Sequence, residues 1–258
     1  MSNINILAET TCNTVVEEFT PQPKQREGYQ TEAQLEDNFI KNLEEQGYEY
    51  LNIHTNDDLV ANLRVQIEKL NGVKFSNGEW QEFFNNVIAN SNENKIEDKT
   101  KLIQESHIHY FKFENGDSKN IYLIDKKNIY NNTLQVINQY VAQKGKGENG
   151  PKHKNRYDVT ILVNGLPLVH VELKKRGERI KEAFNQIERY ERESFWSQSG
   201  LFNFVQIFVI SNGTNTKYYS NNTRWSSIKD RNKKKGEKRK QATALNLQVI
   251  GPTQETSK

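Results

Sequence analysis

The stretch Arg156–Lys174, RYDVTILVNGLPLVHVELK, decides the fold of this 258-residue chain. Two apolar runs, Tyr157–Val163 and Leu168–Lys174, flank the dipeptide Asn164-Gly165, which is typical of a tight turn between antiparallel strands. The stretch therefore predicts an apolar β-hairpin, with further strands and helices on both sides of it in the sequence.

Three charged side chains interrupt this hairpin, at Asp158, Glu172 and Lys174. They need an explanation because burying a carboxylate without a partner is costly. Side chains alternate along a strand, so Glu172 and Lys174 share a face. Two neighbouring carboxylates can bind Mg²⁺ and leave other coordination positions to water and phosphate. The pattern predicts either metal-assisted phosphodiester hydrolysis, with the lysine orienting a water or stabilising negative charge, or a salt-bridged strand pair.

The register of the hairpin decides between these two interpretations. A two-residue loop at Asn164-Gly165 pairs Asp158 with Val171, which puts Asp158 on the wrong face from Glu172. A one-residue shift, through a longer loop or a bulge near Leu166-Pro167, brings Asp158 opposite Glu172. Because bulges often re-aim residues at active sites, we expect such a shift.

The surrounding sequence predicts an α/β fold with a central mixed β-sheet flanked by helices. Thr31 and Gln34 form a capping box for a helix that Gly47 ends, and Asp57 or Asp58 caps a second helix that Gly72 ends. The remaining predicted elements are a helix over 79–89, a polar connection over 90–99, strands over 107–113, 120–125 and 134–141, a helix over 178–193, a central strand over 204–210 and an edge strand over 216–220.

Helices contribute further candidates. Glu36, and after it Glu32, falls within the apolar arc of the first helix, so it is either an auxiliary acid of the site or a structural salt-bridge partner. Gln186 and Tyr190 are i, i+4 neighbours, either auxiliary residues or an ordinary helix surface pair. His170 is expected on the opposite face from Glu172, as a packing residue. A basic strip that could face phosphates consists of Lys174, Lys175, Arg176 and Arg179.

Composition narrows the class of protein. Residues 226–258 carry nine Lys and Arg against three Asp and Glu, mostly in Lys229–Lys240, which is either a solvated tail or a phosphate contact.

The single cysteine, Cys12, excludes a disulfide framework and a zinc–thiolate cluster. GKGENGPK, within Gln143–Arg156, lacks the Gly-Lys-Ser/Thr ending of a phosphate loop. Without an apolar run that could span a membrane, we expect a soluble cytoplasmic protein.

The chain resembles the N-terminal nuclease domain of the restriction (R) subunit of Type I restriction-modification enzymes in the text RYDVTILVNGLPLVHVELKKRG, followed by EAFNQIERY. It is similar to that family also in EAQLEDNFIKNLEEQGYEYL, NIYLIDKKNI, LQVINQY and VQIFVISNG. This resemblance implies a restriction-endonuclease-like core of the PD-(D/E)xK class. It implies that Asp158 and Glu172 hold the metal and that Lys174 is the catalytic lysine.

By the same resemblance, Gln186 with Tyr190 matches the QxxxY element, which the family links to nuclease function through DNA contact, and Glu36 fits the acidic position of the first helix. We expect a flexible arm over 1–29, the nuclease domain over 30–225 and a basic tail or linker over 226–258. R subunits of the family are far longer and contain an ATP-dependent motor, so ATP is expected to serve the full-length subunit only.

The resemblance predicts a Type I site-specific deoxyribonuclease domain that cuts double-stranded DNA with Mg²⁺, for which Mn²⁺ substitutes. The partners that the resemblance implies are the modification and specificity subunits. It implies no contact with a membrane. Two alternatives remain. A stand-alone structure-specific or repair nuclease would cut DNA without a motor, whereas a non-catalytic docking module would bind DNA or partner subunits through the basic tail and need no metal.

Overall fold

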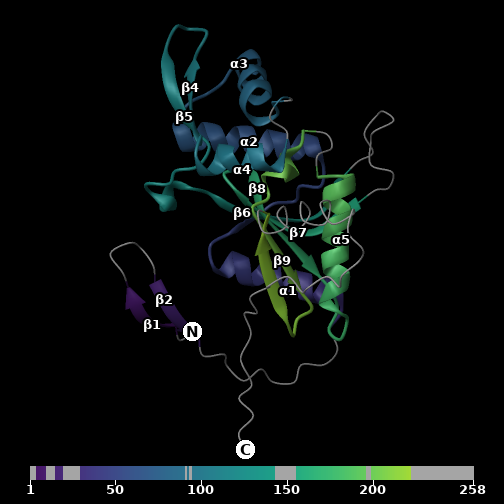
Figure 1. Cartoon of the computed structure of the whole chain (residues 1–258). Helices are drawn as coiled ribbons and strands as arrows, with labels where there is room; N and C mark the ends of the chain where they lie inside the picture. The colour runs from purple at the N-terminus through teal and green to yellow at the C-terminus, as the bar shows by residue number, and fades with distance from the viewer. Residues whose placement is uncertain are drawn as a thin grey trace, which may run out of the picture.

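The computed structural model describes residues 4–9, 15–19, 30–90, 92, 95–142, 155–195 and 199–221. Figure 1 shows a β-sheet at its centre. This sheet has six strands in the order β10-β9-β8-β7-β6-β3. Strands β6, β7 and β8 are antiparallel, whereas β3 pairs with β6 and β9 with β8 in parallel. The strands are β3 Glu49–Tyr50, β6 Leu134–Ala142, β7 Asn155–Val163, β8 Leu166–Leu173, β9 Ile207–Ser211 and β10 Thr216–Ser220. The predicted α/β fold with a mixed central sheet is confirmed.

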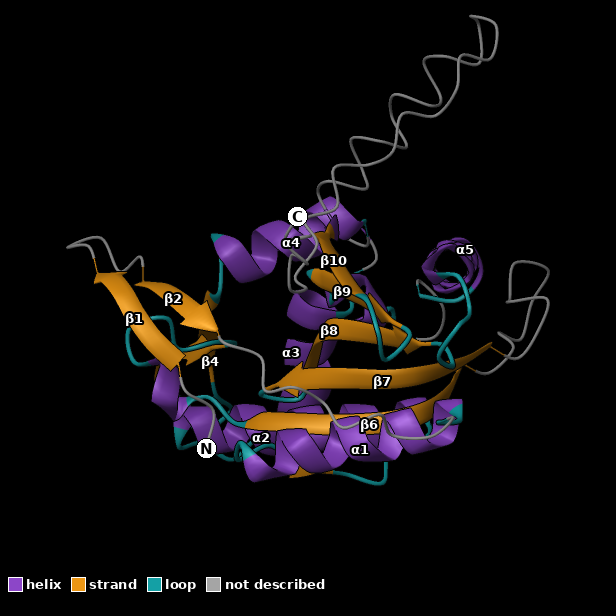
Figure 2. Cartoon of the chain, turned by 90° about the horizontal axis from the view of Figure 1, so that it is seen from below, coloured by secondary structure: helices purple, strands orange, loops and turns teal. Residues whose placement is uncertain are grey.

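Two helices, α1 Glu32–Glu45 and α5 Ile180–Glu193, lie on opposite faces of this sheet (Figure 2). Ile40 and Leu43 of α1 pack in one apolar cluster with valines of β6, β7 and β8. Ala183 and Ile187 of α5 belong to a larger cluster on the other face. Because both faces are covered, β7 and β8 are apolar over most of their length.

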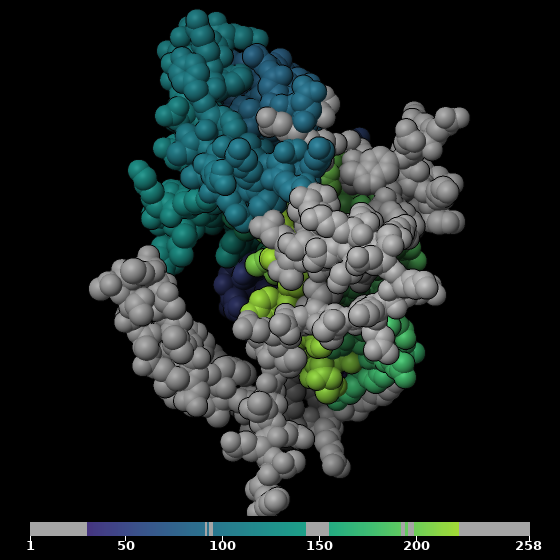
Figure 3. All heavy atoms as spheres, viewed as in Figure 1, coloured from purple at the N-terminus to yellow at the C-terminus, as the bar shows by residue number. Residues whose placement is uncertain are grey.

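Most of the remaining elements gather at one end of the molecule, coloured blue to teal in Figure 3. They are the helices α2 Asn56–Asn71, α3 Asn77–Phe83, which continues as a π-helical turn over Phe84–Ile88, and α4 Ile96–Gln104. The strands β4 Ile108–Lys112 and β5 Ser118–Tyr122 form a hairpin beside them. Short 3₁₀ turns cover Ile129–Asn131 and Leu201–Phe204. A separate two-stranded sheet pairs β1 Ile4–Glu9 with β2 Val15–Phe19 inside the expected arm.

Three local predictions need correction. Helix α4 occupies part of the predicted polar connection, because Lys99 is buried there and its ammonium donates to the Ile88 carbonyl over 2.6 Å. Thr55, rather than an aspartate, caps α2, since its hydroxyl accepts from the Asp58 N–H. The strand predicted over 204–210 is the shorter β9, one place from the sheet edge, whereas β10 is the edge strand as expected.

The capping box of Thr31 and the left-handed stop at Gly72 are confirmed. Several predictions lie outside the described residues, namely those on Cys12, on most of the loop over 143–156 and on the basic run Lys229–Lys240.

The predicted bulge is present in the central hairpin. Pairs Val163↔Leu166 and Leu162↔Pro167 follow the tight turn, but the next pair is Ile161↔Val169, so Leu168 is an extra residue on β8. Proline has no N–H to donate to a ladder and is found at bulges within sheets. The shift of one residue changes which side chains of β7 and β8 face each other beyond this point.

Gly165 fixes the hairpin turn against α2. Its φ is +80°, and a Cβ at this position would lie 2.6 Å from the Leu63 Cα, which is backbone and cannot move aside. We expect Gly165→Ala to lower the free energy of unfolding by about 2–4 kcal/mol, from backbone strain plus overpacking. Gly116→Ala is the matched control, since its φ is +90° with nothing within 4 Å. Equal losses in the two variants, measured by urea unfolding, would contradict the importance of this close approach.

Candidate active site

The bulge places Asp158 opposite Glu172. The last ladder pair is Val159↔Val171, and the same register one residue further sets the two carboxylates across from each other. At this point the Leu173 N–H donates to the Asp158 Oδ2 over 2.9 Å. The Asp158 side chain thus takes the place of a backbone hydrogen bond at the end of the hairpin. The one-residue register shift that would bring Asp158 and Glu172 into one site is confirmed.

Glu172 and Lys174 lie on one face, as alternation predicts. Glu172 is completely buried and its Oε1 lies 3.4 Å from the Lys174 Nζ. The Nζ also donates to the Leu173 carbonyl over 2.9 Å, and only 8% of Lys174 is exposed. The ammonium is therefore held beside the carboxylates instead of extending into solvent.

The two carboxyl groups are electrostatically frustrated. Burial, and then the charge of Glu172, raises the pKa of Asp158 to about 7. Burial likewise raises the pKa of Glu172, against the lowering effects of Lys174 and of a hydrogen bond with Asp158. Glu172 Oε2 is buried without a hydrogen-bond partner. A divalent cation would stabilise both ionised groups, so the donor set fits Mg²⁺.

This fit needs ligands from outside the protein chain. Among the residues that the structure describes, no group of three or more His, Cys, Asp and Glu side chains is close enough to hold a metal ion alone. Two carboxylates completed by water and phosphate oxygens are a usual arrangement for Mg²⁺.

Glu36 reaches the same region from α1. It is 6% exposed, and its carboxylate accepts from the Asn138 Nδ2 over 2.6 Å and from the Gln139 Nε2 over 2.5 Å. Burial raises its pKa, the two amides lower it, and the nearby charge of Asp158 raises it. Glu32 is exposed, and its Oε1 accepts from the Lys175 N–H over 3.4 Å.

His170 lies on the same face as Glu172, so the prediction that the two face apart is wrong. Residues two apart on a strand share a face, and the His170 Nε2 lies 3.4 Å from the Glu172 Oε2. The expected packing is present too, because the ring is fully buried among aromatic side chains. That burial lowers the pKa of His170 to about 4, which makes it a neutral side chain at pH 7.

Gln186 and Tyr190 are hydrogen-bonded to each other on α5. The Tyr190 hydroxyl also donates to the Arg156 carbonyl over 2.7 Å, and the residue is only 1% exposed. As placed, Tyr190 orients Gln186 and secures the start of β7. A contact with DNA at this element would come from the half-buried Gln186.

The basic strip begins where β8 ends. Lys175 Nζ lies 3.1 Å from the Glu178 Oε1 at the surface. Arg176 lines a groove of about 630 Å³ between α1 and strands β8 to β10, which Leu173, the chain neighbour of Glu172, also lines.

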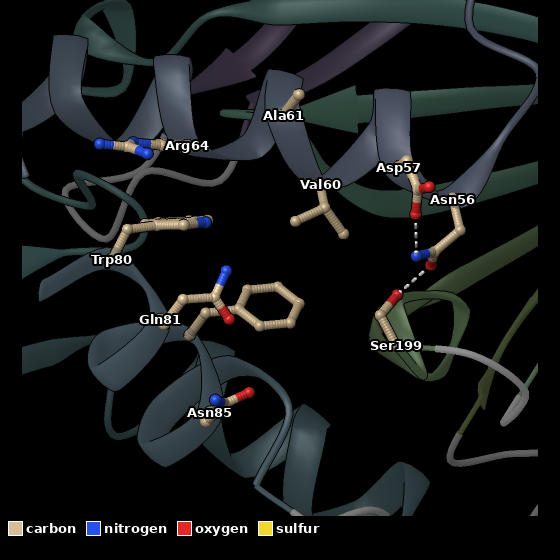
Figure 4. A pocket seen from close by; sticks show the side chains of 10 residues that line it. Asn56, Asp57, Val60, Ala61, Arg64, Trp80, Gln81, Asn85 and Ser199 are labelled. Carbon is tan, nitrogen blue, oxygen red and sulfur yellow. Dashed lines mark hydrogen bonds between the residues drawn. The ribbon is translucent and has the colours of Figure 1, made fainter. Parts of the chain in front are cut away.

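A second pocket lies away from these residues. It measures about 490 Å³ and is lined by α2, by α3 and by Ser199 (Figure 4). Asn56 is hydrogen-bonded to both Asp57 and Ser199, and the Arg64 guanidinium lies 6.0 Å from the Trp80 ring centre. Among its described lining residues Asp57 is the one carboxylate and none is a lysine, so this pocket presents no acid–acid–lysine set.

Gln139 belongs to this region, and the sequence analysis did not predict a role for it. Its φ is +52° in the middle of β6, although no residue in the sequence LQVINQYVA predicts a left-handed backbone conformation there. The contact between His170 and Glu172, by contrast, could have been found from the alternation of the strand.

The chain is similar to a known protein family over most of its length. The family model described as Type I restriction enzyme R protein N terminus matches residues 29–227. The chain is 45% identical over 219 residues to the Type I restriction enzyme EcoprrI endonuclease subunit of Escherichia coli, covering 84% of this chain and 67% of that protein.

More distant relatives bear the same kind of name. The chain is 37% identical over 201 residues to the SauCOLORF180P endonuclease subunit of Staphylococcus aureus (strain COL), and 28% identical over 215 residues to the putative MjaIXP endonuclease subunit of Methanocaldococcus jannaschii. These matches cover 75% and 81% of this chain but 20% and 17% of the relatives. In the part of the chain that the structure describes, no helix has the length and apolar character to cross a membrane.

Proposed function

Because the chain belongs to the family of Type I restriction enzyme R protein N-terminal domains, we propose that it is the Mg²⁺-dependent endonuclease domain of such an enzyme, acting on double-stranded DNA. The observation that carries this proposal is the bulged hairpin, which sets Asp158 opposite Glu172 with the Lys174 ammonium alongside. This arrangement supports nuclease chemistry more than a structural salt bridge, since one lysine cannot neutralise two neighbouring carboxylates, of which Glu172 is fully buried.

In the proposed mechanism, Asp158 and Glu172 hold the metal ion. When bound, Mg²⁺ supplies Lewis-acid stabilisation of the phosphate charge and lowers the pKa of a water. Lys174 donates a hydrogen bond to the attacking water or to a phosphate oxygen as negative charge develops there. Neutral His170, whose Nε2 lies 3.4 Å from the Glu172 Oε2, takes no proton near pH 7, given its lowered pKa.

DNA would lie across the end of the hairpin, where the basic strip begins. We propose that Lys175, Arg176 and Gln186 contact the sugar–phosphate backbone, which positions the duplex without reading its sequence. Target choice would then belong to modification and specificity subunits. The ATP-driven motor of the proposed enzyme would lie outside this nuclease domain, and cleavage would follow translocation.

The experiment is Lys174→Ala in the full-length subunit, assembled with its partner subunits. We expect DNA cleavage to fall by about a hundredfold to a thousandfold, because a charge-stabilising donor is lost at the reacting phosphate. Mn²⁺ affinity should change little, as both carboxylates remain. Lys112→Ala on the exposed β4–β5 hairpin is the charge-matched control and should cut normally. Undiminished cleavage by Lys174→Ala would contradict the proposed role.

DNA cleavage, measured together with DNA binding, separates the alternatives. A stand-alone nuclease predicts strong cutting by this chain alone, without motor or ATP. A docking module predicts DNA binding that depends on Lys229–Lys240 and is unchanged by Glu172→Ala. Our proposal predicts weak or no cutting by the chain alone and full cutting by the assembled enzyme.

A further inference from the structure

Gln139 adopts a backbone conformation that is unusual for its side chain and its position. Its φ of +52° lies in the left-handed region, which residues other than Gly, Asn and Asp rarely enter. The other described non-glycine residue with positive φ, Asn164, occupies the hairpin turn, where that conformation is required. Gln139 instead lies within the nine-residue strand β6.

The position of Gln139 is next to the proposed site. The pairing of β6 with β7 passes from Asn138↔Val159 to Tyr140↔Tyr157. The omitted pair is Gln139 with Asp158, so the left-handed residue lies directly across from a proposed metal ligand. Strained residues of this kind cluster at active sites and persist only where surrounding contacts hold them.

The left-handed turn has a specific structural consequence. Consecutive side chains of a regular strand point to opposite faces, so two neighbours cannot both reach one group. Here the amides of Asn138 and Gln139 both donate to the Glu36 carboxylate, over 2.6 and 2.5 Å. The Tyr50 hydroxyl donates to the Asn138 Oδ1 over 2.9 Å, which fixes the orientation of that amide.

Resting on the function proposed above, we infer that Gln139 is a positioning residue of the nuclease site. Its left-handed backbone turns the amide toward α1, where Gln139 and Asn138 together hold the Glu36 carboxylate at a place where its charge interacts with that of Asp158. Glu36 then acts on the cation site through its charge near Asp158, without being a third ligand. Residues that orient carboxylates around a metal usually change metal affinity tenfold to a hundredfold when removed.

The test measures Mn²⁺ binding by titration calorimetry and melting temperature on the intact chain. We expect Gln139→Ala and Gln139→Gly each to weaken Mn²⁺ binding about tenfold. The two variants should differ in stability: glycine adopts the left-handed turn freely, so Gln139→Gly should melt about 3 °C above Gln139→Ala. Gln81→Ala, on the exposed surface of α3, is the matched control and should bind Mn²⁺ like the unmodified chain.

A double-mutant cycle with Glu36→Gln shows whether Gln139 acts through Glu36. We expect Glu36→Gln alone to weaken Mn²⁺ binding about tenfold, and Glu36→Gln with Gln139→Ala to weaken it no further. Losses that add to about a hundredfold would overturn the inference, as would unchanged binding by Gln139→Ala. A purely structural role would lower the melting temperature without this coupling.

Asp158→Asn, measured alongside, separates this inference from the function on which it rests. If Asp158→Asn abolishes Mn²⁺ binding while Gln139→Ala does not weaken it, only the positioning role is wrong. If Asp158→Asn leaves Mn²⁺ binding intact, the proposed metal site fails and the inference fails with it.

Discussion

Asp158→Asn and Glu172→Gln, introduced separately into the full-length subunit, should each reduce DNA cleavage by about a thousandfold or more. Each substitution keeps the shape of the side chain but removes a charge that the proposed site uses to hold Mg²⁺. Loss of metal-based charge stabilisation amounts to about 4 kcal/mol in the barrier, which corresponds to this factor.

The measurement is conversion of supercoiled plasmid to nicked and linear forms by the assembled enzyme, with ATP consumption recorded in parallel. ATP consumption should persist, because the motor of the proposed enzyme would lie outside this domain. Asp117→Asn is the control, an exposed aspartate between β4 and β5 that should leave cleavage unchanged. Cleavage that survives either Asp158→Asn or Glu172→Gln would remove the metal site from the mechanism.

The metal-free chain should become less stable as pH rises, and Asp158→Asn should abolish part of that loss. The folded-state pKa of Asp158 is raised from 3.8 to about 7, so the folded state binds more protons than the unfolded state. The associated stability is fully present below pH 3.8 and is lost as pH rises through about 7. A pKa shift of this size corresponds to at most about 4 kcal/mol in the free energy of unfolding. Because Asp158 is partly exposed, we expect a contribution of about 2 kcal/mol.

Urea unfolding in chelator between pH 4 and pH 8 measures this effect. The advantage of Asp158→Asn over the unmodified chain should widen by about 2 kcal/mol across that range. Asparagine retains an oxygen for the Leu173 N–H, so packing at the hairpin end is preserved. Mn²⁺ at pH 8 should stabilise the unmodified chain and not the variant. A stability difference between Asp158→Asn and the unmodified chain that stays constant with pH would mean that the pKa of Asp158 is not raised in the folded state.

Much of this arrangement was predictable because it depends on local rules. The turn dipeptide Asn164-Gly165, the capping box of Thr31 and the alternation of Glu172 with Lys174 each follow from two to four neighbouring residues. The bulge beside Pro167 followed from requiring Asp158 and Glu172 to meet. Where such a rule was misapplied, as for the face of His170, the structure corrects it by the same rule.

What could not be predicted depends on contacts distant in sequence. The burial of Lys99 depends on where the π-helical turn ends, which its own segment does not encode. The left-handed Gln139 is held by Glu36, a residue of another element, and local propensity argues against it. The role of Glu36 stayed open for the same reason, since an acid in an apolar arc can be a salt-bridge partner or part of a site.

The central claim is that Asp158 and Glu172 form one cation site across a bulged hairpin. A crystal of this chain soaked in Mn²⁺, with an anomalous difference map, tests it most directly. We predict a peak within coordinating distance of both carboxylates, with the Lys174 ammonium beside it and Leu168 as the extra residue of the hairpin. A map without a peak at this pair, or a hairpin in regular register with Asp158 facing away from Glu172, would contradict the account.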